Sequence, residues 1–304
     1  MAFKLRGLVA ATHTPFDAQG DLRLAAVEAQ ADRLARDGVD TVFIGGTTGE
    51  CSSLTTEERL LLAGRWCEVA RGSALRVVVH VGSNSLADSR TLAAQAQSIG
   101  AVAVAALAPC YFKPKDVDAL VACCVAVAGG APDLPFYFYD IPSMTGVQLS
   151  MPEFLERAPA KLPTLAGLKF TNIDLMAFQE CLAAGGGRFD VLWGVDEALL
   201  AAVALGAEGA VGSSYNFAAP LYHRVIAAFQ AGDLAKARAE QLRAVRLIKL
   251  LSSFGYMAAA KAVMGFLGVD VGPPRLPTVR LTPEQVARLN AGLDQLGFFD
   301  SIRA

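Results

Sequence analysis

The sequence predicts a TIM (β/α)8 barrel with a C-terminal helical extension, and three observations lead to this prediction. Eight short apolar runs of strand type alternate with longer amphipathic runs between residues 8 and 230, which is the repeat of strand–helix units in such barrels. Strand-like runs cease after Gly232. A doubly wound sheet, the structural alternative, usually carries a GxGxxG motif after its first strand, and the sequence has none.

The predicted elements follow one another in a regular order. The strand-like runs are Leu8–Thr12, Thr41–Ile44, Arg76–Val81, Val102–Leu107, Pro135–Ile141, Leu165–Thr171, Asp190–Trp193 and Gly209–Gly212. The helical runs are Leu22–Arg36, Thr56–Arg71, Leu86–Ile99, Val117–Ala128, Pro152–Arg157, Leu175–Ala184, Glu197–Leu205 and Leu221–Gln230.

Local signals mark the helix ends. The segments 55–58 and 150–153 have the pattern of capping boxes, and glycines stand where five helices should stop: Gly38, Gly100, Gly185, Gly206 and Gly232. Residues 233–299 predict three more helices, the last opening with a third capping box at Thr282. We therefore expect a barrel domain over residues 1–232 and a helical extension over 233–304, packed on the barrel.

The composition of the 304-residue chain is that of a soluble globular protein. The hydrophobic content of 53% and the mean hydropathy of +0.39 provide for a large core and exclude disorder. The net charge of −2 predicts neither nucleic-acid nor membrane-surface binding. No signal-peptide pattern and no apolar run of about 18 residues is present, so we expect a cytoplasmic protein.

The cysteines and histidines do not predict a metal site. The six cysteines have no CxxC spacing, and they are expected to be reduced thiols. The three histidines lie far apart in the chain, without an HExxH pair. We therefore expect no metal.

Lys169 is the candidate around which the site is built. Alternate side chains of a strand share a face, so Leu165, Gly167, Lys169 and Thr171 are predicted to face one way. On the inner face of a barrel the amine would be desolvated, its pKa would fall, and a neutral amine is the nucleophile for Schiff-base chemistry. The alternative is a lysine at a strand end whose amine reaches water.

Two further strand ends carry polar groups that converge on the same rim. The segment GGTTGE at 45–50 offers backbone N–H groups and the hydroxyls of Thr47 and Thr48 to a carboxylate or phosphate; a plain glycine turn is the alternative. Tyr139, near the end of the fifth strand, could move protons beside the lysine, although most buried tyrosines are structural.

The last two strands end in carboxylates and hydroxyls. Asp196 and Glu197 follow the seventh strand and are suited to binding sugar hydroxyls, although Glu197 could also belong to a first helical turn. The eighth strand leads into a small polar loop, GSSYN at 212–216, of a kind that binds anions in barrels or serves as an ordinary turn.

At these residues the chain resembles the class I, lysine-dependent pyruvate aldolases, the family that includes the sialic acid lyases and dihydrodipicolinate synthase. The resemblance covers nearly the whole chain, and its most specific motifs are GTTGE at 46–50, YDIP at 139–142, GLK at 167–169 and GVDE at 194–197. Within the family the chain is more similar to the lyases. Met144 stands where the synthases have an arginine, and GSSYN is close to the lyase sequence after the eighth strand.

The resemblance implies a role for each matching position. Lys169 would form the Schiff base and Tyr139 would donate and accept protons. Thr47 and Thr48 would hold the pyruvyl carboxylate. The sugar site would be lined by Thr171, Gly194, Asp196, Glu197 and Ser213. Two positions depart from the family: Asp140 replaces an asparagine, and Tyr111 lies in a changed segment, so it is left out of the site.

The resemblance also implies the reaction: reversible cleavage of a sialic acid into pyruvate and N-acetylmannosamine, without an external cofactor, by a homotetramer.

Three alternatives stay open at this point. One is a related aldolase or dehydratase acting on another 2-keto-3-deoxy sugar acid or hydroxy-keto acid, dihydrodipicolinate synthase-like enzymes included. The second is a metal-dependent aldolase, which the scarcity of histidine opposes. The third is a non-catalytic barrel that binds keto acids.

Overall fold

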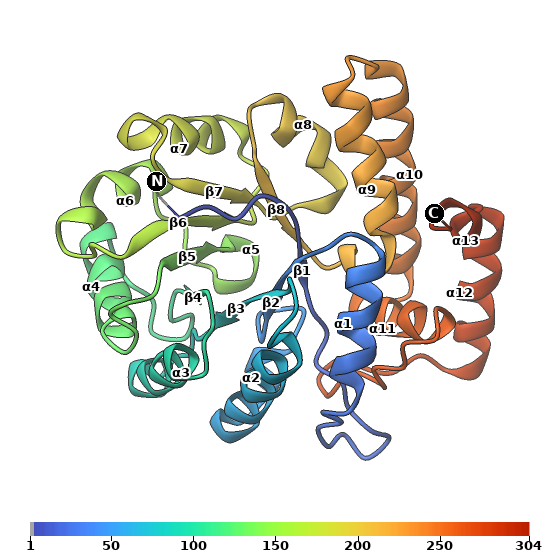
Figure 1. Cartoon of the computed structure of the whole chain (residues 1–304), viewed down its shortest axis with the longest axis horizontal. Coiled ribbons are helices and arrows are strands. Elements are labelled where there is room, and N and C mark those ends of the chain that lie inside the picture. The colour runs from blue at the N-terminus through green and yellow to red at the C-terminus, as the bar shows by residue number, and fades with distance from the viewer. Residues whose placement is uncertain (1–2, 304) are drawn as a thin grey trace.

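The chain forms a closed barrel of eight parallel strands in chain order, as predicted. The structure is a computed structural model that describes residues 3–303. Each strand pairs with its two neighbours, and β8 closes the ring on β1 (Figure 1). The strands are β1 Gly7–Ala11, β2 Thr41–Ile44, β3 Arg76–His80, β4 Ala103–Leu107, β5 Phe136–Asp140, β6 Leu165–Phe170, β7 Asp190–Trp193 and β8 Gly209–Gly212.

Helices surround the strands. Those of the barrel are α1 Ala26–Arg36, α2 Thr56–Ala70, α3 Leu86–Ser98, α4 Val117–Ala128, α5 Pro142–Thr145, α6 Met151–Arg157, α7 Leu175–Gly187, α8 Leu199–Ala204 and α9 Tyr215–Gln230, with short 3-10 turns η1 Cys51–Ser53, η2 Ala158–Ala160 and η3 Asp196–Ala198. Those after Gly232 are α10 Leu234–Ser253, α11 Tyr256–Phe266, α12 Pro283–Gln295 and the four-residue α13 Phe298–Ser301, which the sequence did not predict.

The barrel separates two apolar clusters. Side chains that point inward, such as Val9, Phe43 and Tyr139, form a cluster inside the ring of strands. Side chains that point outward, such as Leu168 and Phe170, pack against the helices in a larger cluster. Because both faces of a parallel sheet are covered, a polar side chain on the inner face is removed from water unless it lies at a strand end.

The predicted face of Leu165 is wrong. The pairing of β5 with β6 shifts register after Phe136, so that Tyr137 lies opposite Gly167. Such an irregularity inserts one residue and reverses the alternation before it. Leu165 therefore packs in the outer cluster, and Ala166 contacts the inner one. The alternation predicted from Lys169 onward is unaffected.

Two helix starts differ from their predictions. At 150–153 the Ser150 hydroxyl accepts the Glu153 N–H, but the return bond of a capping box is missing; the boxes at Thr55 and Thr282 are complete. Helix α9 begins at Tyr215, six residues before the predicted Leu221, and contains Pro220 and a kink at Ala218. The predicted polar loop after β8 is therefore short, and its last two residues are buried in a helix.

The helices after Gly232 lie along one side of the barrel. Helices α9 and α10 lie side by side, and α12 packs against α10 and α11 and leads into α13 (Figure 1). A buried ion pair ties α11 to the barrel: Lys261 Nζ lies 2.6 Å from Glu50 Oε1 and also donates to the carbonyl oxygens of Thr14 and Pro273. The guanidinium of Arg275 adds a second link, because it donates to the carboxylate of Glu58 on α2.

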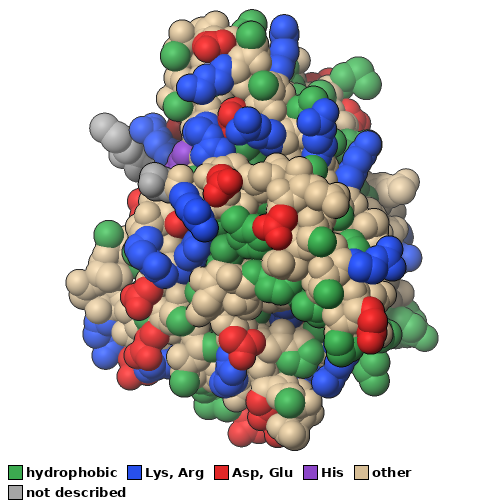
Figure 2. Space-filling model, turned by 90° about the vertical axis from the view of Figure 1, so that its right-hand side faces the viewer, with side chains coloured by type: hydrophobic (Ala, Val, Ile, Leu, Met, Phe, Trp, Pro, Cys, Tyr) green, Lys and Arg blue, Asp and Glu red, His purple; other side chains and the backbone are tan. Residues whose placement is uncertain are grey.

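The surface is of mixed charge on the face that carries the last helices. Lys and Arg side chains are interspersed there with Asp and Glu (Figure 2). Within residues 3–303 no single helix is long and apolar enough to cross a membrane, although α10 and α11, bent by 111° at their junction, pass the length and composition test as a pair.

Replacing Lys261 should test how strongly the extension is tied to the barrel. In Lys261→Met the Glu50 carboxylate keeps its buried position without a cation, so we expect the free energy of unfolding to fall by about 3–5 kcal/mol. We propose that the barrel and the extension unfold as one unit, in a single thermal transition. The control is Arg303→Ala, which removes an exposed ion pair with Asp300 and should cost less than about 1 kcal/mol. Equal effects of the two variants, or two separate transitions, would contradict this account.

Candidate active site

The Lys169 amine lies inside the barrel near the carboxyl ends of the strands. Its side chain projects from β6 toward the rings of Phe43 and Tyr139, with Nζ 4.1 and 4.0 Å from the two ring centroids. The residue is 4% exposed. Burial lowers the pKa of Lys169 to about 7, although the carboxylate of Asp196 acts in the opposite direction. A substantial fraction of the amine is therefore neutral at neutral pH.

A hydroxyl pair lies beside this amine. Tyr139 is the register partner of Lys169 on β5, and its phenol oxygen is 3.2 Å from Thr47 Oγ1. Burial raises the pKa of Tyr139 to about 12, while the hydroxyls of Thr47 and Thr171 oppose that rise. The phenol keeps its proton at neutral pH, so it can transfer a proton only when it receives another in exchange.

The turn that carries Thr47 and Thr48 is compact and needs its glycines. Gly45 has φ +63°, and a Cβ on Gly46 would lie 2.7 Å from the ring of Phe43. Glu50 closes the turn with φ 56°, a left-handed conformation that is uncommon for a side chain of its size. The Lys261–Glu50 ion pair and the N–H of Arg275, which donates to Glu50 Oε2, hold it there.

His80 fastens the same turn from the other side. Its Nδ1 donates to the carbonyl oxygen of Gly45, and its Nε2 accepts the N–H of Leu107. Burial and the neighbouring Arg59 hold the pKa of His80 well below its usual value, so the ring is neutral, as this bonding pattern requires. This role of His80 was not predicted, because His80 ends a strand between two valines, without an adjacent polar residue in the sequence.

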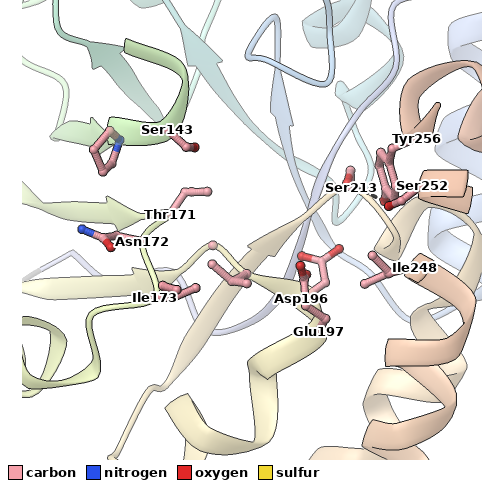
Figure 3. A pocket seen from close by; sticks show the side chains of 13 residues that line it. Ser143, Thr171, Asn172, Ile173, Asp196, Glu197, Ser213, Ile248, Ser252 and Tyr256 are labelled. Atoms are coloured by element: carbon pink, nitrogen blue, oxygen red, sulfur yellow. Dashed lines mark hydrogen bonds between the residues drawn. The ribbon is translucent and has the colours of Figure 1, made fainter. Parts of the chain in front are cut away.

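An open cavity of about 470 Å³ continues the site outward. Its lining includes five of the predicted residues: Thr171, Gly194, Asp196, Glu197 and Ser213. In Figure 3 the side chains of Ser143, Thr171, Asn172 and Ile173 lie on one side, and those of Ser213, Ile248, Ser252 and Tyr256 on the other. Lys169, Tyr139, Thr47 and Thr48 do not line this cavity. The candidate site therefore has an inner part around the amine and an outer part with room for a longer ligand.

Asp196 is buried, in contrast to the exposed Glu197. Its Oδ2 accepts the N–H and the hydroxyl of Ser214, and a Cβ on Gly212 would collide with the carboxylate. Burial raises the pKa of Asp196 to about 6, and the bonds to Ser214 oppose that rise. Asp196 thus orders the end of β8 as well as facing the cavity, while Glu197 is available to a ligand.

Comparisons with known proteins show which family the chain belongs to. The sequence profile described as the dihydrodipicolinate synthetase family matches residues 4–296. The chain belongs to this family. Among curated relatives, the protein named N-acetylneuraminate lyase of Mus musculus is 42% identical over 308 residues, covering 99% of this chain and 96% of the relative. The lyase A of Xenopus laevis is 42% identical, covering 91% and 92%.

Solved structures lead to the same family. The N-acetylneuraminate lyase of Proteus mirabilis superposes with a TM-score of 0.95 at 40% identity, covering 97% of this chain and all of that one. A dihydrodipicolinate synthase of Cyanidioschyzon merolae superposes with a TM-score of 0.89 at 28% identity, covering 96% of this chain and 98% of the synthase. The similarity to the lyase branch of the family, predicted from the sequence, is confirmed by these relatives.

Asp140 and Tyr111, the two positions that depart from the family motifs, lie outside the inner part of the site. Asp140 is buried, points away from the barrel interior as its neighbour Tyr139 points inward, and has an unpartnered Oδ2. Burial raises the pKa of Asp140 to about 7, so it is partly neutral at neutral pH. Tyr111 and Met144 are exposed at the rim. The Asp140 carboxyl therefore does not face the Lys169 amine.

Helices α10 and α11 supply a wall of the site that was not predicted from the sequence. Ile248, Ser252 and Tyr256 line the cavity, and Tyr256 bonds to Ser213. No signal in the sequence identifies them, because they belong to helices outside the strand–helix repeat. Among residues 3–303, no group of three or more His, Cys, Asp or Glu side chains is arranged to hold a metal ion.

Replacing Lys169 by an apolar residue should stabilise the protein. The pKa of Lys169 is lower in the folded chain than in the unfolded one, so the folded state binds fewer protons between pH 7 and the pKa of a free lysine, and stability rises with pH across that window. In Lys169→Met we expect a melting temperature several degrees above wild type at pH 7, with a difference that shrinks toward pH 10. The exposed Lys161→Met is the control and should melt like wild type. A lower melting temperature for Lys169→Met at pH 7 would refute a buried, destabilised amine.

Proposed function

We propose that this protein is a Schiff-base aldolase that reversibly cleaves N-acetylneuraminate into pyruvate and N-acetylmannosamine. The observation that carries the proposal is the buried Lys169 amine with its lowered pKa, beside the Tyr139–Thr47 hydroxyl pair. The relatives named N-acetylneuraminate lyase, at about 40% identity over nearly the whole chain, support the substrate.

The amine begins the reaction. Neutral Lys169 attacks the C2 carbonyl carbon of the open-chain sugar acid, and loss of water gives an iminium ion. Before this step the inner site needs the substrate carboxylate to be held in place. The hydroxyls of Thr47 and Thr48 and the N–H groups of their turn would do this.

The carbon–carbon bond then breaks toward the iminium. The proton of the C4 hydroxyl leaves, the electrons of the C3–C4 bond form an enamine, and C4 becomes the aldehyde of N-acetylmannosamine. The enamine takes a proton at C3, and water hydrolyses the resulting iminium to pyruvate and free Lys169. No external cofactor takes part in this sequence.

Tyr139 moves the C4 proton through a relay. With its pKa raised to about 12, the phenol is not ionised in advance. It accepts the C4 proton while it donates its own toward the substrate carboxylate, which Thr47 would hold. In the outer cavity, Thr171, Gly194, Asp196, Glu197 and Ser213 would surround the polyol and N-acetyl groups.

We also propose that the protein works as a cytoplasmic homotetramer with a small-molecule substrate and without nucleic acid or membrane. Exposed apolar side chains stand on the segments that follow three adjacent strands, β4, β5 and β6, and such a surface is suited to contact a second copy. These side chains are Tyr111, Phe112, Met144, Ile173 and Met176. All six cysteines are unpaired thiols, as is usual in a reducing compartment.

The proposal is tested by following Lys169 through the reaction. Wild type should release pyruvate from N-acetylneuraminate, and borohydride with pyruvate should leave one reduced pyruvyl group on Lys169, located by mass spectrometry. Lys169→Ala should lose roughly a thousandfold or more in activity, because it removes the amine that forms the iminium. The control Lys161→Ala changes an exposed lysine and should behave as wild type. A pyruvyl group on another residue, or no cleavage of N-acetylneuraminate by wild type, would refute the proposal.

A further inference from the structure

The outer cavity has one wall that comes from outside the barrel. Ile248 and Ser252 of α10 and Tyr256, the first residue of α11, face the cavity opposite Thr171 and Ile173 (Figure 3). Helices α10 and α11 bend by 111° at their junction, so Tyr256 stands at the elbow between them. Gly255, with φ +86°, makes the turn directly before it.

The phenol of Tyr256 is bonded to Ser213. The two hydroxyl oxygens lie 2.8 Å apart, 43 residues apart in the chain (dashed line in Figure 3). Burial raises the pKa of Tyr256, and the carboxylates of Asp196 and Glu197 raise it further, so the phenol keeps its proton. Two hydroxyls joined by one hydrogen bond use one of their two protons. The pair therefore presents one directed O–H donor to the cavity.

The backbone beneath Ser213 is fixed. The Asp196 carboxylate binds the N–H and hydroxyl of Ser214, and it fills the space where a side chain on Gly212 would stand. The Ser213 side chain can still rotate about its χ1 bond, and the bond to Tyr256 selects one of its rotamers. A residue of the extension thus sets the direction of a hydroxyl at the end of β8.

We propose that Tyr256 is a positioning residue that determines specificity for the sugar part of the substrate, by orienting the Ser213 hydroxyl and forming the cavity wall together with Ile248 and Ser252. This inference rests on the proposed function. It predicts a division of labour: the inner residues around Lys169 bind the pyruvyl part, and the wall from α10 and α11 acts on the sugar alone.

Condensation of pyruvate with N-acetylmannosamine tests this division, because each co-substrate reports on one part of the site. In Tyr256→Phe the ring stays and one hydroxyl is lost, and we expect the KM for N-acetylmannosamine to rise about five- to tenfold. The KM for pyruvate and the rate of borohydride trapping on Lys169 should stay as in wild type. Tyr215→Phe is the matched control: it loses a buried hydroxyl that has no hydrogen-bond partner in the described structure, and it should leave both KM values unchanged.

Two further variants separate positioning from a general structural effect. In a Ser213→Ala background, Tyr256→Phe should cause no additional rise in the KM for N-acetylmannosamine, because its partner is already gone. Ser252→Leu, at an exposed position of α10, should fold normally and raise the same KM by narrowing the cavity.

The outcomes distinguish this inference from the proposed function. If wild type neither cleaves nor forms N-acetylneuraminate, the proposed function fails and this inference fails with it. If wild type is active but Tyr256→Phe matches Tyr215→Phe, the inference alone is wrong. It is also wrong if both KM values rise equally in Tyr256→Phe, or if the effect is undiminished in the Ser213→Ala background.

Discussion

The removal of one amine from water is the constraint on which the rest of this site depends. Lys169 projects into the barrel, where desolvation disfavours its cation and brings its pKa to about 7. The rings of Phe43 and Tyr139 exclude water from two sides of Nζ. An exposed lysine in the same position would be protonated at neutral pH and unable to attack a ketone. The cost of burying this side chain is offset by the packing of the barrel around it.

The surroundings of the amine are held by contacts that come from distant parts of the chain. The turn with Thr47 and Thr48 is fixed on one side by His80 and on the other by Glu50, whose partner Lys261 belongs to α11. The same group of helices supplies Tyr256 to the outer cavity. The extension is therefore part of the site in two places, once through a buried ion pair beneath the inner part and once through the wall of the outer part.

The sequence was sufficient to predict those parts of the fold and of the site that follow from a local residue pattern. The eight strands recur with a regular spacing, and alternation from Lys169 to Thr171 placed both on the inner side. It was insufficient where one inserted residue shifts the pairing of two strands. The irregularity in β6 turned the Leu165 side chain to the opposite face of the sheet. The Ser213–Tyr256 and Glu50–Lys261 pairs could not be predicted either, because a pairing between residues 43 or 211 positions apart leaves no periodic signal.

The most direct measurement is the pH dependence of the reaction at Lys169 itself. The rate at which pyruvate and borohydride modify Lys169, followed by mass spectrometry of the peptide that contains it, reports the fraction of neutral amine at each pH. The account predicts that this rate, corrected for the pH dependence of borohydride and of a free lysine peptide, rises with a midpoint near pH 7. A midpoint near that of an ordinary lysine, about 10.4, would contradict it.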